Sequence, residues 1–412
     1  MNLTAKILIG MAAGYLFGSL MDLLGLDLPV NAFLVDTVLF IVGKVFLASL
    51  TLLVVPLVFV SLVCGTAALD DIKKLGRVGG RSFVLYLSTT AIAISLALLA
   101  AFLIQPGVGF NLQADMSFQV KEVPSLVQTI INIFPTNPIK AMAEGNMLQI
   151  IIFAILFGLA LTMVGQKGKP VLNLFESANE VIMKMVMIIM ELAPYGVFCL
   201  IAQVFAKQGI DAIVPLAKYF FVVSFVLLAH LFITYPILLK FAVGVSPIQF
   251  FRNFKNVMLF AFSTASSNAT LPVTLQATEK KLGVNNSIAS FTVPLGATIN
   301  MDGTAVMQGV ATVFIAQAYG FDLNVSQFLL VVLTAVLASV GTAGVPGVGL
   351  VMLAMVLKQV GLPVEGIGLI IGVDRLLDMM RTAVNVAGDA TVSCVVAKME
   401  DQFSEEIFLK DD

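Results

Sequence analysis

Charged side chains are scarce in this sequence. Asp, Glu, Lys and Arg make up only 12% of its 412 residues, whereas 59% are hydrophobic and the mean hydropathy is +1.02. A soluble globular domain carries about 25% charged residues. The scarcity of charge therefore excludes an ordinary soluble domain and indicates a membrane protein.

Cysteine, histidine and clustered basic residues are also few. The three cysteines, Cys64, Cys199 and Cys394, lie far apart in apolar segments, which excludes metal-ligand spacing and a secreted disulfide pattern. The single histidine, His230, has no cysteine or serine partner in a catalytic pattern, so we expect it to pack or to form a local hydrogen bond. The net charge of −2, without a long basic cluster, argues against nucleic acid as a partner.

Long apolar runs recur along the whole chain. Residues 38–63, 82–104 and 219–239 are each about as long as the ~20 residues that a helix needs to cross a hydrocarbon core of roughly 30 Å. Residues 1–26 contain a further apolar run, which Asp22 interrupts and no cleavage pattern follows, so we interpret it as a first membrane helix. The sequence therefore predicts an all-α polytopic protein embedded in a lipid bilayer.

The basic residues indicate the orientation of the chain. The first three basic clusters fall after every second crossing, and because such loops are usually cytoplasmic, we expect both termini to be cytoplasmic. Lys255 and Lys281 should lie on this same side, yet about 25 residues separate them, too few for two crossings of ~20 residues each. The segment between them must enter and leave the membrane at one face.

Two segments have the composition of re-entrant hairpins. The centre of the first, residues 263–270, is small and polar, and such backbone is tolerated at membrane depth only where protein or water satisfies its polar groups. The second, residues 339–347, is rich in glycine and lies between apolar arms at 328–338 and 348–357. A helix with polar residues follows each hairpin, so the pattern predicts inverted repeats, an arrangement typical of transporters.

A polar stretch interrupts the apolar helix after the first hairpin. It contains Gly296, Asn300, Asp302 and Gly303, and a helix that unwinds there frees carbonyl groups to bind a cation such as sodium, which prefers oxygen ligands. Asp302 is the strongest candidate for an ion ligand, because a carboxylate at mid-membrane costs ~3 kcal/mol or more unless a partner offsets it. The alternative is that the glycines only permit close helix packing and that Asp302 is a structural polar residue.

Polar residues also form a stripe on the last long helix. Positions 374, 378, 381, 385 and 389 are three or four residues apart, which puts them on one helical face. We expect Arg381 to hold a carboxylate in two parallel hydrogen bonds and Asp378 to bind an ammonium group. Together these groups match an amino acid with a second carboxylate. The alternative, an internal pair between Asp378 and Arg381, does not exclude substrate binding.

These motifs resemble those of the dicarboxylate/amino acid:cation symporter family, the glutamate transporter homologues, over nearly the whole chain. The matching segments are 263–272, 300–304, 341–347 and 378–389. The resemblance implies eight transmembrane helices plus two re-entrant helical hairpins, inverted repeats, a homotrimer and an elevator-type mechanism. It also implies four successive parts, which are a scaffold domain at 1–75, a transport domain at 76–115, a scaffold and trimerisation domain at 116–212, and a transport domain at 213–412.

The resemblance further implies a role for individual residues. Arg381 would bind the side-chain carboxylate of the substrate and Asp378 its amino group. The other substrate contacts would come from Thr304, Asn385, Ser267, Thr382 and the backbone near Val345. Sodium, as the coupling ion, would bind first at Gly296, Asn300, Asn385 and Asp389, second at Tyr86, Thr89, Thr90, Asn300 and Asp302, and third at backbone groups of Thr298, Ser339, Val340 and Thr342.

A few positions distinguish this chain within the resemblance. Family members usually carry an extra arginine either before the hairpin serines or beside the substrate aspartate, and Ala265 and Met379 stand at those positions here. Arg375 is off the polar stripe, and we expect it to contact another helix or a lipid headgroup. Gln308 stands where proton-coupled animal relatives carry a glutamate, which favours sodium alone as the coupling ion.

The sequence therefore predicts a sodium-coupled symporter of L-aspartate or L-glutamate in a prokaryotic-type inner membrane. We expect no enzymatic activity, because no set of nucleophile, base and metal ligands is present. The nearest alternative is a carrier of the same fold that couples to protons or transports a plain C4-dicarboxylate. An ion channel gated by the hairpins is a further alternative.

Overall fold

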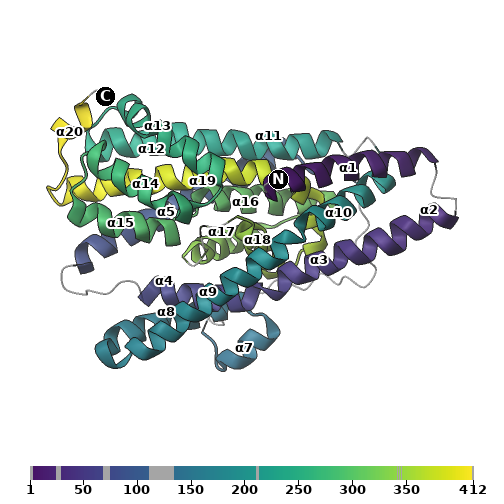
Figure 1. Cartoon of the computed structure of the whole chain (residues 1–412), viewed down its shortest axis with the longest axis horizontal. Helices are drawn as coiled ribbons and strands as arrows, with labels where there is room; N and C mark the ends of the chain where they lie inside the picture. Colours follow the sequence, from purple (N-terminus) through teal and green to yellow (C-terminus); the bar gives the residue numbers. More distant parts are fainter. Residues whose placement is uncertain are drawn as a thin grey trace.

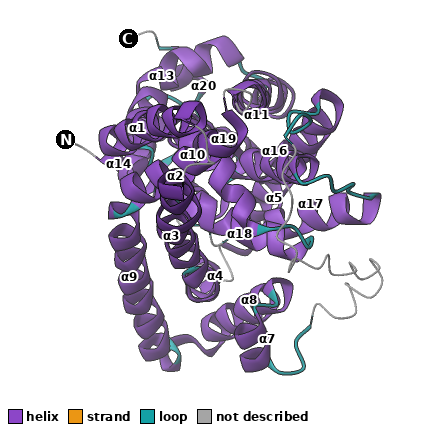
Figure 2. Cartoon of the chain, turned by 90° about the vertical axis from the view of Figure 1, so that its right-hand side faces the viewer, coloured by secondary structure: helices purple, strands orange, loops and turns teal. Residues whose placement is uncertain are grey.

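The protein is a bundle of helices. The computed structural model describes residues 3–24, 29–67, 75–110, 134–209, 213–340, 342, 344 and 346–410. Within these ranges the only β contact is the isolated bridge between Val284 and Phe403. Figure 1 shows the long helices running roughly parallel to the long axis of the molecule, and Figure 2 shows the same bundle from one end. The prediction of an all-α fold is confirmed.

The first half of the bundle consists of long apolar helices and short connecting turns. Its elements are α1 (Leu3–Leu24), α2 (Pro29–Phe33), η1 (Leu34–Leu39), α3 (Phe40–Leu52), α4 (Val54–Ala67), α5 (Leu75–Ile104), α7 (Pro138–Glu144), α8 (Met147–Val164), η2 (Gly165–Lys167), α9 (Lys169–Glu191) and α10 (Ala193–Gln208).

The second half contains shorter and more interrupted helices. Its elements are α11 (Ile213–Ala229), η4 (His230–Thr234), α12 (Tyr235–Leu238), η5 (Leu239–Val243), α13 (Pro247–Thr264), α14 (Ser267–Lys280), α15 (Asn286–Ile299), α16 (Asp302–Ala318), α17 (Val325–Ser339), α18 (Val348–Gln359), η6 (Val364–Gly366), α19 (Ile367–Met399) and α20 (Glu405–Leu409).

Several helices have the length and composition of membrane spans. Within the described ranges five helical segments pass this criterion, and a sixth is added if α9 and α10, bent by 50°, form one span. The broken pair α15–α16 and the polar helix α19 are not among these spans. The structure thus has several helices that are long and apolar enough to cross a membrane, while the count of eight stays a prediction.

Both predicted hairpins are present as pairs of packed helices. In the first, α13 ends at Thr264, and the next residue, Ala265, has a left-handed φ of 50°. The side chain of Ser266 caps α14 by accepting from the Ala269 N–H. In the second, α17 and α18 are 15 and 12 residues long, shorter than the ~20 residues of a full crossing. Each hairpin therefore turns back within the bundle.

The helix after the first hairpin is broken where the sequence predicts an unwound turn. α15 ends at Ile299, α16 begins at Asp302, and Asn300 and Met301 between them have non-helical backbone angles. Pro294 lies inside α15 and removes one backbone donor from its last turns. The break leaves polar groups of the backbone and of Asn300 available in the middle of the protein.

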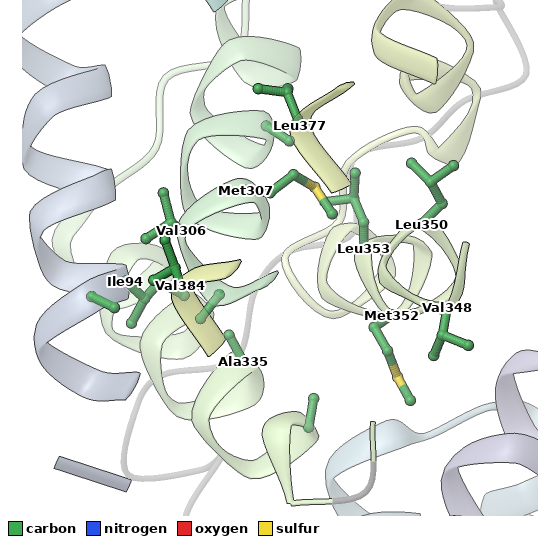
Figure 3. Close-up of a cluster of buried hydrophobic side chains, with 14 of the residues drawn as sticks. Ile94, Val306, Met307, Ala335, Val348, Leu350, Met352, Leu353, Leu377 and Val384 are labelled. Atoms are coloured by element: carbon green, nitrogen blue, oxygen red, sulfur yellow. The ribbon is translucent and has the colours of Figure 1, made fainter. Parts of the chain in front are cut away.

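A buried apolar core holds α16 and α19 in place. α16 packs against α5, α11 and α19, while α19 also contacts α13, α15 and α18. Figure 3 shows part of this core, where Val306 and Met307 of α16 meet side chains from α5, α18 and α19. Because such interiors are close-packed, the polar side chains on α16 and α19 are held at fixed positions inside the bundle.

Candidate substrate and ion site

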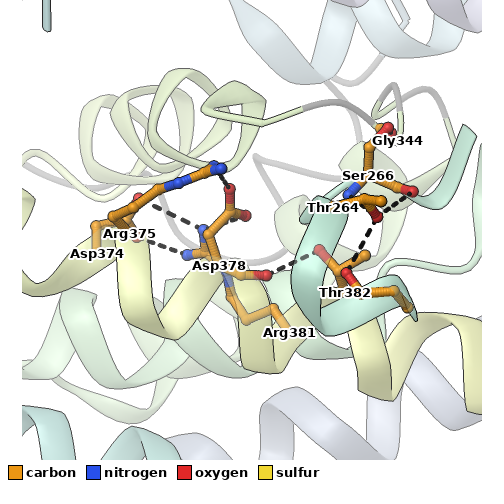
Figure 4. Close-up of polar contacts among 9 residues, drawn as sticks. Thr264, Ser266, Gly344, Asp374, Arg375, Asp378, Arg381 and Thr382 are labelled. Atoms are coloured by element: carbon orange, nitrogen blue, oxygen red, sulfur yellow. Dashed lines mark hydrogen bonds and ion pairs between the residues drawn. The ribbon is translucent and has the colours of Figure 1, made fainter. Parts of the chain in front are cut away.

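The guanidinium group of Arg381 lies at the centre of a buried ion cluster on α19. The Arg381 side chain is 1% exposed, and its Nη1 donates to Oδ1 of Asp374 at 2.7 Å. Its Nη2 donates to Oδ1 of Asp378 at 2.8 Å (Figure 4). A buried charge of this kind persists only when it is paired. The internal Asp378–Arg381 pair considered from the sequence is therefore present, and Asp374 is its third member.

The stripe on α19 faces the interior, as its spacing predicts. All five positions are buried, and they place the Arg381 cluster one helical turn from Asn385 and two turns from Asp389. The Asn385 amide is held by α16, because its Oδ1 accepts from the Gly303 N–H at 2.7 Å. The stripe thus joins the ion cluster around Arg381 to the buried carboxylate of Asp389.

Arg375 makes a contact on its own helix that was not predicted from the sequence. Its Nη1 lies 3.3 Å from Oδ2 of Asp378, so the side chain takes part in the ion cluster on its own helix. The spacing of three residues from Arg375 to Asp378 permits this contact, because side chains at i and i+3 lie on neighbouring rows of a helix. The cluster therefore has two carboxylates and two guanidinium groups.

The tips of the two hairpins meet beside this cluster. The Ser266 hydroxyl donates to the Gly344 carbonyl at 2.7 Å, and the Asn268 N–H donates to the same oxygen at 3.1 Å (Figure 4). A Cβ atom on Gly344 would lie 2.9 Å from Cβ of Ser267, which is itself buried. This contact brings Ser267 to the tip of the second hairpin. The expected role of Val345 falls outside the described residues.

Two other predicted substrate residues lie around Arg381. A Cβ atom on Gly349 of α18 would be 3.3 Å from Arg381 Nη2 and 3.4 Å from Cγ2 of Thr304, so these three residues adjoin one another. Thr382 is buried and its hydroxyl donates to the Asp378 carbonyl at 2.8 Å. The structure thus gathers Thr304, Thr382 and Arg381 at the junction of α16, α18 and α19.

The Asp302 carboxylate is buried between three donors from other elements. Thr90 of α5 donates to Oδ1 at 2.6 Å, and the Tyr235 hydroxyl donates to Oδ2 at 2.9 Å. Nε2 of His230 lies 3.1 Å from the same Oδ2. Sequence reasoning selected Thr90 but missed Tyr235 and His230, which lie in an apolar run of which only the π-helical turn η4 is unusual.

Asn300 lies at the break between α15 and α16, and its amide joins this break to α19. Its Nδ2 donates to Oδ1 of Asp389 at 2.8 Å and to the Asn385 carbonyl at 3.1 Å. Its Oδ1 is buried and has no hydrogen-bond donor within the described part of the chain. A buried oxygen that lacks a donor fits a cation, because a cation needs only lone pairs.

Gly296 leaves room for the groups next to Asp389. A Cβ atom at this position would lie 2.5 Å from Oδ1 of Asp389 and 2.7 Å from the Tyr86 hydroxyl oxygen. Tyr86 donates to the Thr292 carbonyl at 2.9 Å and approaches the Asp389 carbonyl at 3.5 Å. The structure therefore brings the polar side chains of Asn300, Asp389 and Tyr86 together next to Gly296, which has no side chain to fill the space beside them.

The other residues that were predicted to bind sodium include four whose side-chain hydroxyls donate to nearby backbone carbonyls. The Thr89 hydroxyl donates to the Tyr86 carbonyl, which keeps it on α5 next to the Asp302 region. The hydroxyls of Thr298, Ser339 and Thr342 donate to carbonyls three or four residues earlier in the chain. The sodium site expected at the backbone of these residues stays a prediction. Val340, the fourth member of that set, is buried at the end of α17.

Comparison with known proteins gives the family of the chain. The sequence model described as the sodium:dicarboxylate symporter family matches residues 3–399. The chain is 39% identical to a proton/sodium-glutamate symport protein of Bacillus caldotenax over 89% of this chain and 88% of the relative. It is 37% identical to the proton/glutamate-aspartate symporter of Escherichia coli strain K12, over 98% of this chain and 94% of the relative.

A relative with another printed substrate is similar at nearly the same level. The C4-dicarboxylate transport protein of Rhodospirillum rubrum is 35% identical over 98% of this chain and 90% of the relative. These relatives are transporters and not enzymes. The match over almost the whole sequence shows that the chain belongs to the sodium:dicarboxylate symporter family.

Proposed function

We propose that this membrane transporter is a sodium-coupled symporter of acidic amino acids, L-aspartate or L-glutamate. The observation that carries the proposal is the buried Arg381 guanidinium next to the Asp378 carboxylate, at the point where the hairpin tips meet. Arg381 offers a planar pair of donors to the substrate's side-chain carboxylate, and Asp378 offers an acceptor to its ammonium group. Ser267, Thr304, Thr382 and Asn385 would complete the contacts.

In the structure Asp374 and Asp378 occupy the Arg381 donors. A substrate carboxylate must therefore replace at least one of these contacts when it binds. Because a buried guanidinium without a carboxylate is costly, the internal pairs keep the arginine neutralised between transport events. The cost of breaking an internal pair is offset by the new pair with the substrate.

The oxygen groups around Asn300 support sodium as the coupling ion. The carboxylates of Asp302 and Asp389 are buried, and the lone Asn300 Oδ1 lies between their helices. Hard cations take such oxygen ligands, and a bound sodium ion would neutralise buried carboxylates. Asn385 connects the two functions, because its carbonyl accepts from Asn300 and it lies one turn from Arg381. Substrate and ion would thus act on one another through α19.

The remaining features of the proposal concern the whole protein. We place it in the inner membrane as a homotrimer with both termini cytoplasmic. The parts at 1–75 and 116–212 would form the scaffold, and those at 76–115 and 213–412 would move as the transport domain in an elevator mechanism. All residues of the two proposed sites then belong to the moving part.

The test is uptake of labelled L-aspartate into proteoliposomes that contain the purified protein. We expect accumulation under an inward sodium gradient and none under a proton gradient without sodium. Saturable accumulation against the substrate gradient would separate this carrier from a channel. Accumulation driven by protons alone would contradict sodium coupling.

A second candidate is transport of C4-dicarboxylates or coupling to protons. It is favoured by the relatives, whose names include a proton/glutamate-aspartate symporter and a C4-dicarboxylate transport protein. Arg381 would serve either substrate, whereas Asp378 is useful only for a substrate with an amino group. Unlabelled L-aspartate and succinate, added as competitors in the same uptake assay, distinguish the two substrate classes.

A further inference from the structure

Both oxygens of the Asp378 carboxylate have a guanidinium partner in this structure. Oδ1 accepts from Nη2 of Arg381 at 2.8 Å, and Oδ2 lies 3.3 Å from Nη1 of Arg375. A substrate ammonium group that binds Asp378 must therefore displace one of them. The charge at this carboxylate is already neutralised before any substrate arrives.

Arg375 is the partner that is easier to displace. Its contact with Asp378 is longer than that of Arg381, and its side chain is 10% exposed whereas that of Arg381 is 1% exposed. Arg381 also holds Asp374, so moving it would break two ion pairs. Moving the Arg375 head breaks its longer contact with Asp378 and takes a less buried group.

A small free space adjoins these side chains. Asp374, Arg375 and Asp378 line a pocket that has about 20 Å³ of free space, and Phe46 of α3 and Val197 of α10 lie across from them. This space holds about one water, which is too little for an amino acid. Binding of a substrate at Asp378 therefore requires side chains to rearrange, and Arg375 borders the free space.

We propose that Arg375 is a specificity-determining residue that stands in for the substrate's ammonium group at Asp378. An amino acid replaces the Arg375 guanidinium with its own ammonium group, so Asp378 remains neutralised. A C4-dicarboxylate has no such group, and Arg375 then stays on Asp378 and lets the site accept the substrate. This inference rests on the proposed function, since it assigns a role within the same site.

Removing the guanidinium separates the two substrate classes. Without Arg375, L-aspartate no longer has to displace a competitor at Asp378, and its affinity rises. Succinate would instead leave one buried oxygen of Asp378 without a cation, and its affinity falls. A general loss of positive charge would weaken the binding of both anions, so opposite shifts are the signature of competition at Asp378.

The experiment is isothermal titration of the purified full-length protein with L-aspartate and with succinate, in buffer containing sodium. In Arg375→Ala we expect the Kd for L-aspartate to fall severalfold and the Kd for succinate to rise about tenfold, which corresponds to about 1.4 kcal/mol. Arg375→Gln retains a long side chain without the charge, and it should likewise lower the Kd for L-aspartate and raise the Kd for succinate. Arg77→Ala, which removes a guanidinium from Glu400 far along α19, is the matched control and should shift neither constant.

The other outcomes overturn the proposal. Parallel weakening of both ligands would make Arg375 a general counter-charge, and unchanged constants in both variants would make it a bystander. If the unmodified protein bound neither ligand while retaining its thermal stability, the proposed function would fail first, and the inference with it. If Arg77→Ala changed the Kd for L-aspartate as much as Arg375→Ala did, the effect of Arg375→Ala could not be assigned to its contact with Asp378.

Discussion

Gly296 is a residue whose missing side chain has a direct consequence for ion binding. A methyl group there would come within 2.5 Å of Oδ1 of Asp389 and 2.7 Å of the Tyr86 hydroxyl oxygen. We therefore expect Gly296→Ala to weaken sodium binding by about 5- to 150-fold, since overpacking costs about 1–3 kcal/mol. The measurement is the sodium concentration that gives half-maximal L-aspartate uptake.

Gly80 provides the matched control for this substitution. It also lies within a helix, α5, and a methyl group added there would have no neighbour within 4 Å. Gly80→Ala should leave the sodium dependence unchanged and stabilise the helix by roughly 0.5–1 kcal/mol. If Gly296→Ala has the same sodium dependence as the unmodified protein, sodium does not bind next to Asp389.

Single residues also show where sequence reasoning stops. Asp302, Arg381 and Asp389 were predictable because a charge inside an apolar helix is expensive and must have a use. Tyr235 and His230 were not, because a tyrosine or histidine in an apolar run is compatible with simple packing. Their contact with Asp302 depends on how η4 and α12 lie against α16, and no local spacing encodes that arrangement.

At the scale of elements, the hairpin tips depend on a few hydrogen bonds. The Ser266 hydroxyl donates to the Gly344 carbonyl and also caps α14 by accepting from the Ala269 N–H. We expect Ser266→Ala to lower L-aspartate affinity about 5- to 30-fold, because it loses contacts worth one or two kcal/mol. The measurement is equilibrium binding of L-aspartate to the purified protein.

Ser263 offers a control on the same hairpin. Its hydroxyl donates only to the Leu259 carbonyl of its own helix, and the side chain is exposed. Ser263→Ala should therefore bind L-aspartate as the unmodified protein does. Equal losses in Ser263→Ala and Ser266→Ala would point to an effect on α13 as a whole and against a specific role of the tip contact.

The elements were more predictable than the contacts between them. Both hairpins and the break at Asn300 were foreseen, because small, polar and glycine-rich stretches inside apolar surroundings cannot continue as lipid-facing helices. The meeting of the tips through Ser266 and Gly344 was not foreseen, since it joins segments 78 residues apart. The contact of Arg375 with Asp378 was missed for another reason. Arg375 is not on the polar stripe, but its long side chain reaches Asp378 at i+3.

At the scale of the whole molecule, one ion pair joins the proposed scaffold to the proposed transport domain. Nζ of Lys44 in α3 lies 2.8 Å from Oε1 of Glu365 in η6. Burial by itself raises the pKa of Glu365, but the hydrogen bond and charge of Lys44, with the backbone and Lys358, lower the pKa below its ordinary value. The pair is therefore intact at neutral pH and is lost only when the pH falls through that lowered pKa.

This ion pair must break if the transport domain slides along the scaffold. The two side chains are 36% and 39% exposed, and such exposed pairs contribute about 0–1 kcal/mol, so breaking the pair is a small obstacle to movement. A covalent link at the same place is a large obstacle. We therefore expect Lys44→Cys with Glu365→Cys, joined by a short bifunctional thiol reagent, to abolish L-aspartate uptake while binding of L-aspartate in detergent persists.

The cross-link also distinguishes movement of one domain from local closure of the hairpins. Cys64, Cys199 and Cys394 are first replaced by serine so that the reagent meets only the two new thiols. Each single cysteine variant, treated with the same reagent, should transport at its untreated rate, because nothing then ties α3 to η6. If the linked protein instead carries L-aspartate as fast as the unlinked one, the boundary between residues 1–75 and 213–412 does not move during transport. Closure of the hairpin tips over Arg381 would then be sufficient for the cycle, because the link at η6 leaves those tips free.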